Sequence, residues 1–388
     1  MNKHGELEID AFKSLNSNFP LTFTFVLTEA CQLICKYCYF AGKNRENHMT
    51  FETAQKGIDY LLENPHIFSH KRIVFDFIGG EPFLEVDLMN KISSYIKKRM
   101  YELNHPWFND YMFNVSTNGL LYSDPKVREF ISNNRAHLEI GITIDGTREK
   151  HNLNRIFPNG KGSYDEVIKQ IPLWLKDFPN ASTKVTVASD DMPYLADSII
   201  HLFNLGIKTV NSNVVFENVW KENDDKIFGE QLIKLADKII DDKYYIDYQC
   251  SFFSESIGKP ENNNDNWCGS GRNMIALDGH GNFYPCVRFT PFSMSQKKTT
   301  VSVGNINSGL DFNKLRPFLT LDKFSQSTEE CINCEIASGC AWCVGFNYDS
   351  AATDTIYQRA TYICKMHKAR VRANNYFQQR LMEAKKND

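Results

Sequence analysis

Residues 21–40 read LTFTFVLTEACQLICKYCYF, and in them a β-strand pattern runs directly into three closely spaced cysteines. Residues 21–27 form a short run of Leu, Thr, Phe and Val, which predicts a buried strand. Cys31, Cys35 and Cys38 follow with the spacing C-x3-C-x2-C. Four interpretations are open: core packing, a disulfide with one thiol left over, a zinc site short of one ligand, or an iron–sulfur site with one open iron.

The composition is that of a soluble globular protein large enough for one big domain and a smaller one. The chain has 388 residues, of which 42% are hydrophobic and 23% are charged. A net charge of −3 gives no bulk attraction to nucleic acid or to anionic lipid. No apolar run reaches the ~18–20 residues of a membrane span, and the first twenty residues carry no signal-peptide pattern. We therefore expect a cytoplasmic protein, in which eleven cysteines are better explained as metal ligands than as disulfides.

The first half of the chain alternates strand-like and helix-like patterns. The strand-like runs are 21–27, 72–78, 111–116, 137–144, 183–189 and 208–216. The segments between them carry apolar residues at helical spacing, as in TFETAQKGIDYLLEN (50–64) and LEVDLMNKISSYIKKRM (84–100). Strand–helix alternation indicates βαβ units and a parallel sheet. Six units predict an α/β fold, a partial (β/α)6 barrel of the TIM type that stops short of the full eight.

The pattern changes after residue 245, where cysteines become frequent. We expect the partial barrel over residues 20–240, a cysteine-rich module of short strands and loops over 241–375, and the end of a C-terminal helix over 376–388. The cysteines of this half are Cys250, Cys268, Cys286, Cys331, Cys334, Cys340, Cys343 and Cys364. Read alone, CINCEIASGCAWC has the C-x2-C-x5-C-x2-C spacing of a zinc knuckle.

The first cysteine motif resembles the signature of the radical S-adenosylmethionine (SAM) family. That signature is C-x3-C-x-aromatic-C after the first barrel strand, and here it is formed by Cys31, Cys35, Tyr37 and Cys38. The resemblance implies that the three thiolates hold a [4Fe–4S] cluster whose open iron chelates SAM. It also implies that reductive cleavage of SAM gives a 5′-deoxyadenosyl radical, which abstracts a hydrogen atom from the substrate. The cofactors, rather than side chains, would carry this chemistry, and no catalytic side chain is assigned.

Further stretches at successive strand ends strengthen the resemblance. GGEP (79–82) follows the second predicted strand, STNG (116–119) ends the third, and TIDG (143–146) ends the fourth, followed by His151 and Arg155. In the family these loops surround SAM. The residues that the resemblance assigns to the cofactor are Tyr37, Gly79, Gly80, Glu81, Ser116, Asn118 and Arg128.

The second cysteine set, read with its flanks, resembles a SPASM domain, the auxiliary-cluster module of peptide-modifying radical SAM enzymes. Cys268, Gly281 and Cys286 fit its first part, and the later cysteines fit C-x2-C-x5-C-x3-C followed by a distant cysteine, except that the last spacing is x2. The resemblance implies two auxiliary [4Fe–4S] clusters and therefore three clusters in total. One would be held by Cys331, Cys334, Cys340 and Cys364, and the other by Cys268, Cys286 and Cys343.

The second of these auxiliary clusters would have only three cysteine ligands. Cys250 is a candidate fourth ligand, but we favour a buried, non-ligating role for it. An unfilled iron could then bind a substrate thiolate, as in thioether-forming peptide maturases. Sulfatase-maturing relatives carry an Asp directly after the second cysteine of the module, and Val287 stands there in this chain, followed by Arg288. Because Val cannot take a proton, this position favours a peptide maturase over a sulfatase maturase.

The resemblance thus implies an anaerobic, cytoplasmic radical SAM oxidoreductase that matures a ribosomally made precursor peptide (RiPP), most simply by forming a Cys thioether. The tail RATYICKMHKARVRANNYF (359–377) resembles that of maturases whose peptides carry repeated Cys-x-x-x units. The alternatives are C–C crosslinking and sulfatase-type formation of formylglycine. Expected partners are the precursor peptide and a reductant such as flavodoxin or ferredoxin. Leader recognition would fall to the barrel, the SPASM module or a separate leader-binding protein.

Overall fold

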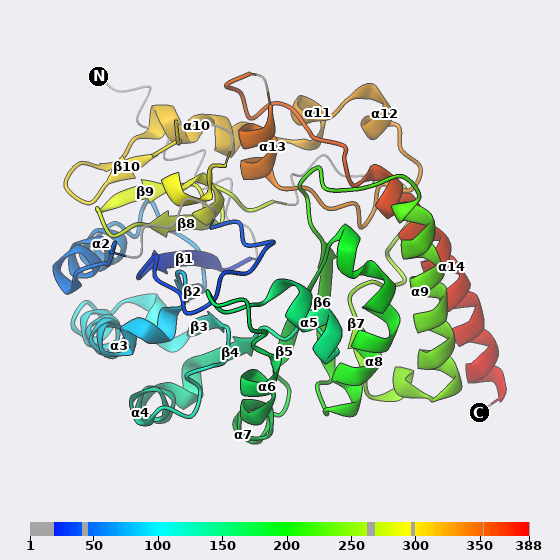
Figure 1. Cartoon of the computed structure of the whole chain (residues 1–388). Helices are drawn as coiled ribbons and strands as arrows, with labels where there is room; N and C mark the ends of the chain where they lie inside the picture. Colours follow the sequence, from blue (N-terminus) through cyan, green and yellow to red (C-terminus); the bar gives the residue numbers. More distant parts are fainter. Residues whose placement is uncertain (1–18, 41–45, 262–267, 296–298, 352, 388) are drawn as a thin grey trace.

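The computed structural model describes residues 19–40, 46–261, 268–295, 299–351 and 353–387. It confirms the predicted α/β fold, because six parallel strands follow the chain in order and alternate with helices (Figure 1). The six strands are β1 (Leu21–Val26), β2 (Ile73–Ile78), β3 (Tyr111–Thr117), β4 (Leu138–Ile142), β5 (Ser182–Val187) and β6 (Thr209–Val214). Each lies within a few residues of a run expected from the sequence.

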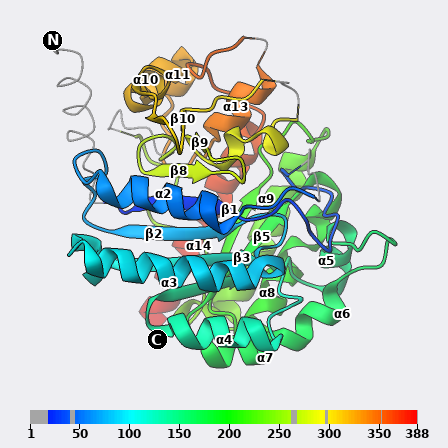
Figure 2. The ribbon, with the colours of Figure 1, turned by 90° about the vertical axis from the view of Figure 1, so that its left-hand side faces the viewer.

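Helices cover the outer face of these strands. They are α2 (Phe51–Glu63), α3 (Val86–Glu102), α4 (Pro125–Asn134), α5 (Arg148–Asn154), α6 (Tyr164–Val167), α7 (Ile171–Asp177), α8 (Leu195–Asn204) and α9 (Asp224–Asp241). Figure 2 looks onto α2, α3 and α4, which lie side by side over the first strands. Side-chain caps fix several helix starts: Thr50 accepts a hydrogen bond from the Thr53 N–H, and Asp124 accepts one from the Lys126 N–H.

The barrel is open between β4 and β5. Strands β1 to β4 form one parallel ladder, and β5, β6 and the short β7 (Gln249–Cys250) form a second. Among the described residues no backbone ladder joins the two sheets. The Thr183 side chain bridges them instead, since its hydroxyl donates to the Ile142 carbonyl at 2.7 Å and accepts from the Ile144 N–H at 3.2 Å. The curved sheet can therefore enclose a space without closing into a full barrel.

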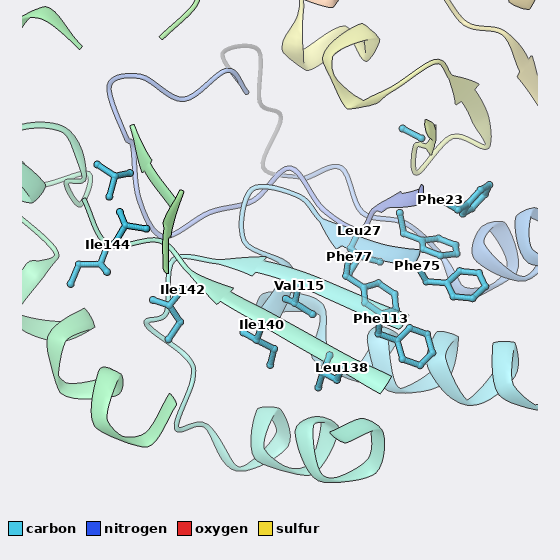
Figure 3. Close-up of a cluster of buried hydrophobic side chains, with 14 of the residues drawn as sticks. Phe23, Leu27, Phe75, Phe77, Phe113, Val115, Leu138, Ile140, Ile142 and Ile144 are labelled. Carbon is cyan, nitrogen blue, oxygen red and sulfur yellow. The ribbon is translucent and has the colours of Figure 1, made fainter. Parts of the chain in front are cut away.

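The hydrophobic core lies between the strands and the outer helices. Alternate side chains of the first three strands, such as Phe25, Phe77 and Phe113, point to this face and are fully buried. Their rings stack closely, with centroids 5.7 Å apart for Phe25 and Phe77 and 5.8 Å apart for Phe77 and Phe113. Figure 3 shows Phe77 and Phe113 of this group beside the aliphatic side chains of β4. The opposite face of the same strands is consequently left to line the barrel interior.

The C-terminal part extends the barrel sheet. Strand β8 (Met274–Leu277) pairs parallel to β1, and β9 (Asn282–Tyr284), β10 (Gly304–Asn305) and β11 (Gly309–Leu310) continue from it in antiparallel order. Short helices follow: α10 (Phe312–Thr320), α11 (Lys323–Gln326), α12 (Glu329–Ile332) and α13 (Val344–Ser350).

The last helix returns to the barrel. Helix α14 (Cys364–Asn387) runs along α9 (Figure 1), where Arg380 forms ion pairs with Asp237 at 2.6 Å and Asp241 at 2.8 Å. The helix is continuous through residue 376, where we expected the C-terminal segment 376–388 to begin. The predicted domain boundaries stay predictions. Within the described residues, no helix has the length and apolar character needed to cross a membrane.

Candidate functional site

The first cysteine set lies on the loop that leaves β1 at its carboxyl end. Backbone hydrogen bonds fix this loop to distant segments: the Ile34 N–H donates to the Ile156 carbonyl at 2.8 Å, and the Lys36 N–H donates to the Asn154 carbonyl at 3.0 Å. Its last part is a tight turn in which the Cys38 N–H donates to the Cys35 carbonyl at 3.1 Å. All three cysteines line one cavity at this end of the barrel.

The three thiols are close enough to influence one another. Burial raises the pKa of the Cys35 thiol to about 11, while Arg155 lowers that pKa and the Cys38 and Cys31 thiols raise it. This crowding opposes three free thiolates, and a cationic centre bound between them would relieve it. The residues therefore fit the donor set of a [4Fe–4S] cluster with three thiolate ligands.

The GGEP loop packs against the cysteine loop through backbone atoms. The Gly80 N–H donates to the Thr28 carbonyl at 2.8 Å, and the Glu81 N–H donates to the Ala30 carbonyl at 2.8 Å. A Cβ atom at Gly80 would lie 2.1 Å from the Ala30 oxygen, and one at Gly79 would lie 2.4 Å from the Thr28 oxygen. The two glycines are thus required by the approach of the cysteine loop, whatever else they contact.

Glu81 is a buried brace between the GGEP and STNG loops. Its carboxylate accepts hydrogen bonds from the Thr117 hydroxyl at 2.6 Å, the Asn118 N–H at 2.8 Å and the Phe83 N–H at 3.1 Å. Burial raises the pKa of Glu81, and these three donors lower it. Asn118 continues the contact, because its Nδ2 donates to Gln32 Oε1 at 3.1 Å and lies 3.9 Å from Cys31 Sγ. The loops of three successive strands therefore position one another.

We expect Glu81→Gln to lower the free energy of unfolding by about 1–3 kcal/mol, because one buried amide N–H would lose its acceptor. The Gln oxygen can serve either the Asn118 N–H or the Phe83 N–H, whereas its NH₂ group faces the other donor. A thermal or urea unfolding midpoint measures the effect. Glu52→Gln on the exposed first turn of α2 is the matched control, and equal midpoints for the two variants would contradict the bracing role.

The other predicted cofactor residues have different surroundings. The Tyr37 hydroxyl donates to the Asp145 carboxylate and accepts from Arg155 at 3.0 Å, so this ring is locked beside the cysteines. Ser116 is exposed to the cavity. Arg128 lies on α4, where it pairs with Asp177 and packs over the Tyr122 ring with its guanidinium 5.3 Å from the centroid. Its predicted contact with SAM stays a prediction.

The cavity itself has a volume of about 1210 Å³, and polar side chains such as Asn114 and Glu139 stand among the residues that line it. Thr24, Asp76, Asn114 and Glu139 occupy facing register positions on β1 to β4, on the side opposite the aromatic core. The Thr24 hydroxyl donates to Asp76 at 3.2 Å, and Asn114 donates to Asp76 at 2.6 Å. Small and polar inner side chains leave the barrel interior unfilled, so it can receive an extended substrate.

The C-terminal cysteines fall into two groups by their mutual electrostatic effects. Burial raises the pKa of Cys268 to about 12, with Cys286 and Cys343 raising it further. Burial likewise raises the pKa of Cys340, with Arg359 lowering it and Cys364, Cys331 and Cys334 raising it. These neighbourhoods coincide with the two ligand sets that the sequence resemblance implies.

Zinc is the alternative interpretation of these cysteines. Across the described parts of the chain, no three His, Cys, Asp or Glu side chains converge tightly enough to hold one metal ion. A structural zinc ion needs four ligands, with thiolates about 2.3 Å from a single centre.

Cys250 lies apart from both groups. It is 6% exposed on β7, and its Sγ is 3.9 Å from the Ser212 hydroxyl. Burial raises its pKa, and the groups that lower it are the Phe252 backbone, Ser212 and Arg370, with no cysteine among these described neighbours. This placement supports the buried, non-ligating role.

We accordingly expect Cys250→Ala to retain the full iron content after anaerobic reconstitution, within the error of an iron assay. Cys268→Ala is the matched comparison and should lose up to about four irons per chain. An equal loss of iron in both variants would identify Cys250 as a cluster ligand and overturn the assignment.

The sequence did not reveal the roles of several site residues. Asp145 and Arg155 belong to or follow TIDG, but only the structure shows that both hold Tyr37. Lys184 and Arg288 line the cavity from β5 and from the segment after Cys286. Lys184 lies opposite Asn211 of β6, and the alternation of side chains along β5 puts it on the inner face of the sheet. That alternation is the sequence signal from which Lys184 could have been found.

Comparisons with known proteins identify relatives of this chain. Residues 25–188 match the model of the Radical SAM superfamily. The cysteine-type anaerobic sulfatase-maturating enzyme of Clostridium novyi is 26% identical over 146 residues, covering 37% of this chain and 37% of that protein. The subtilosin biosynthesis protein AlbA of Bacillus subtilis is 23% identical over 276 residues, covering 70% of this chain and 55% of that protein. The chain thus spans about half or less of the length of these two relatives.

Two solved structures share the fold over nearly the whole chain. Native anSMEcpe with bound AdoMet superposes with a TM-score of 0.71 at 19% identity, covering 95% of this chain and all of that one. Streptococcus suis SuiB bound to the precursor peptide SuiA superposes with a TM-score of 0.61 at 14% identity, covering 93% of this chain and 80% of that one. At these identities the likeness establishes the fold.

Proposed function

We propose that the protein is a radical SAM enzyme that matures a ribosomally made peptide, because residues 25–188 match the model of the Radical SAM superfamily. The observation that carries the proposal is one continuous cavity, lined by Cys31, Cys35 and Cys38 at one part and by Cys343 at another. A peptide segment in this cavity would lie between a radical source and a second metal centre. AlbA is named for the biosynthesis of the bacteriocin subtilosin, and SuiB is seen bound to a precursor peptide, and both support the proposal.

The family implies SAM and one [4Fe–4S] cluster, and we propose two auxiliary clusters at the two C-terminal cysteine groups. When bound, these groups supply reductive cleavage of SAM, abstraction of a substrate hydrogen and an acceptor for the remaining electron. The chain's own task is positioning. Glu81 holds the STNG loop against the cysteine loop, and Tyr37 is fixed between Asp145 and Arg155. Ser116, exposed to the cavity, is available to contact the cofactor.

The bond we propose is a Cys thioether, with the substrate thiolate held at the cluster of Cys268, Cys286 and Cys343. Cys250 is buried in the second sheet, and its described neighbours include none of these three cysteines, which supports an open iron there. C–C crosslinking would use the same cavity. Sulfatase maturation is a second candidate because of the Clostridium novyi relative, but Val287 lines the cavity where that activity calls for a base.

The direct test is anaerobic reconstitution followed by incubation with SAM and dithionite. We expect about twelve irons per chain and release of 5′-deoxyadenosine. A precursor peptide supplied with the loaded enzyme should lose two hydrogens per crosslink, which mass spectrometry detects. Protein that binds zinc without a brown chromophore, or loaded protein that releases no 5′-deoxyadenosine, would refute the proposed function.

A further inference from the structure

Most charged side chains that line the cavity already have protein partners. Glu81 is held by three donors, Glu217 pairs with Arg288 at 2.8 Å, and Asp177 pairs with Arg128 and Arg135. Arg155 donates to Tyr37 at 3.0 Å. These side chains already form hydrogen bonds or ion pairs with other protein residues, so they are poorly suited to bind a charged group of a substrate.

Lys184 is different. It projects from β5 into the cavity, where its side chain remains accessible to solvent although protein surrounds it. Its ammonium forms no hydrogen bond and no ion pair with any residue that the structure describes. Three N–H donors of one cation are therefore free to meet a ligand in the cavity.

The cavity that Lys184 lines also contains Cys31, Cys35 and Cys38 of the first cysteine set and Cys343 of the second. Burial lowers its pKa, Arg288 lowers it further, and Asp145 and Cys343 raise it. Asp145 is bonded to Tyr37 of the first cysteine loop, whereas Cys343 belongs to the second set. Two cations, Lys184 and Arg288, thus face this part of the cavity, and Glu217 neutralises one of them. One positive charge is left without a carboxylate partner.

We propose that Lys184 anchors an anionic side chain of the peptide substrate, a carboxylate or a cysteine thiolate, between the first cysteine set and Cys343. The inference rests on the proposed function and narrows its substrate class. Glu139 is the other charged cavity residue for which no partner is seen among the described residues, and it lies in the Thr24–Asp76–Asn114 row rather than among the neighbours of Lys184. A competing role for Lys184 is that of counter-ion to a cluster bound by Cys343.

The experiment selects peptides by binding, independently of turnover. A random 12-residue mRNA-display library is panned anaerobically on immobilised, cluster-loaded, SAM-bound protein. Wild type, Lys184→Met and Lys184→Glu are compared, with Lys169→Glu, a 62% exposed surface lysine, as the control. We expect wild type and control to enrich one acidic residue or one cysteine. K184M should bind the selected peptide at least about tenfold more weakly, and K184E should enrich Lys or Arg instead.

The outcomes separate the alternatives. Enriched Asp or Glu identifies a carboxylate as the anion, and enriched Cys identifies a thiolate. The inference is overturned if wild type and K184E enrich the same residues, or if no anionic residue is enriched. It is also overturned if K184M changes only the midpoint potential of an auxiliary cluster in an EPR-monitored titration, which would show a counter-ion. If loaded wild-type protein releases no 5′-deoxyadenosine, the proposed function is refuted. The comparison of the peptides that wild type and K184E bind does not depend on that result.

Discussion

Replacing Cys31, Cys35 and Cys38 together by Ala is expected to reduce 5′-deoxyadenosine release to the level of enzyme-free controls. The three thiols line the same cavity, and the Cys38 and Cys31 thiols both raise the pKa of Cys35. Without them the open-iron cluster loses all its protein ligands. Iron content should fall from about twelve to about eight per chain, because the C-terminal groups keep their own ligands. An iron assay and chromatography of the SAM products measure both effects.

The control for this variant is Cys250→Ala, which removes a cysteine that is buried and outside the three groups. It should keep the iron content of the wild type. If the triple variant kept twelve irons and its activity, the first cysteine set would have no role in SAM cleavage. If it lost all iron, the three groups would depend on one another rather than forming separate sites.

Most of the barrel could be predicted because its strands have a strong local signal. The run expected at 208–216 is found as Thr209–Val214, and that expected at 72–78 as Ile73–Ile78. In β2 the buried positions alternate with less buried ones, whereas in β6 only Val210 is buried and the local signal is the β-rich composition of the run. Such patterns depend on neighbours in the sequence, so they can be read without the structure. The spacing of the cysteines also depends only on neighbouring residues in the sequence, so the cysteine motifs could be recognised without the structure.

The roles of single side chains in the site could not be predicted in this way. Glu81 stands in a loop expected to contact SAM, yet its carboxylate serves Thr117 and Asn118, 36 and 37 residues away. Arg155 reaches Tyr37 across 118 residues of chain. Lys184 belongs to no motif at all, and its importance comes from the absence of a partner among the described residues. These contacts are set by the curvature of the sheet, which no local pattern encodes.

Gly80→Ala should disrupt both the fold around the site and its chemistry. The added methyl group would lie 2.1 Å from the Ala30 oxygen, 2.5 Å from the Ala30 carbonyl carbon and 2.6 Å from the Glu29 oxygen. All three atoms belong to the backbone, so no side chain can move aside to relieve the overlap. The GGEP and cysteine loops must then separate, with loss of the hydrogen bond from the Gly80 N–H to the Thr28 carbonyl. We expect a cost of about 3 kcal/mol in unfolding free energy and little 5′-deoxyadenosine.

The same substitution at Gly229 is the matched control, because that glycine lies within α9 and an added Cβ would meet only the Ala369 Cβ at an ordinary 3.8 Å. Replacing a helical Gly by Ala at an open position should stabilise the protein by about 0.5–1 kcal/mol. The two variants therefore shift the thermal midpoint in opposite directions. A Gly80→Ala protein with the stability and SAM cleavage of the wild type would mean that the cysteine loop can retreat without cost. The tight packing of the two loops would then be no requirement of the site.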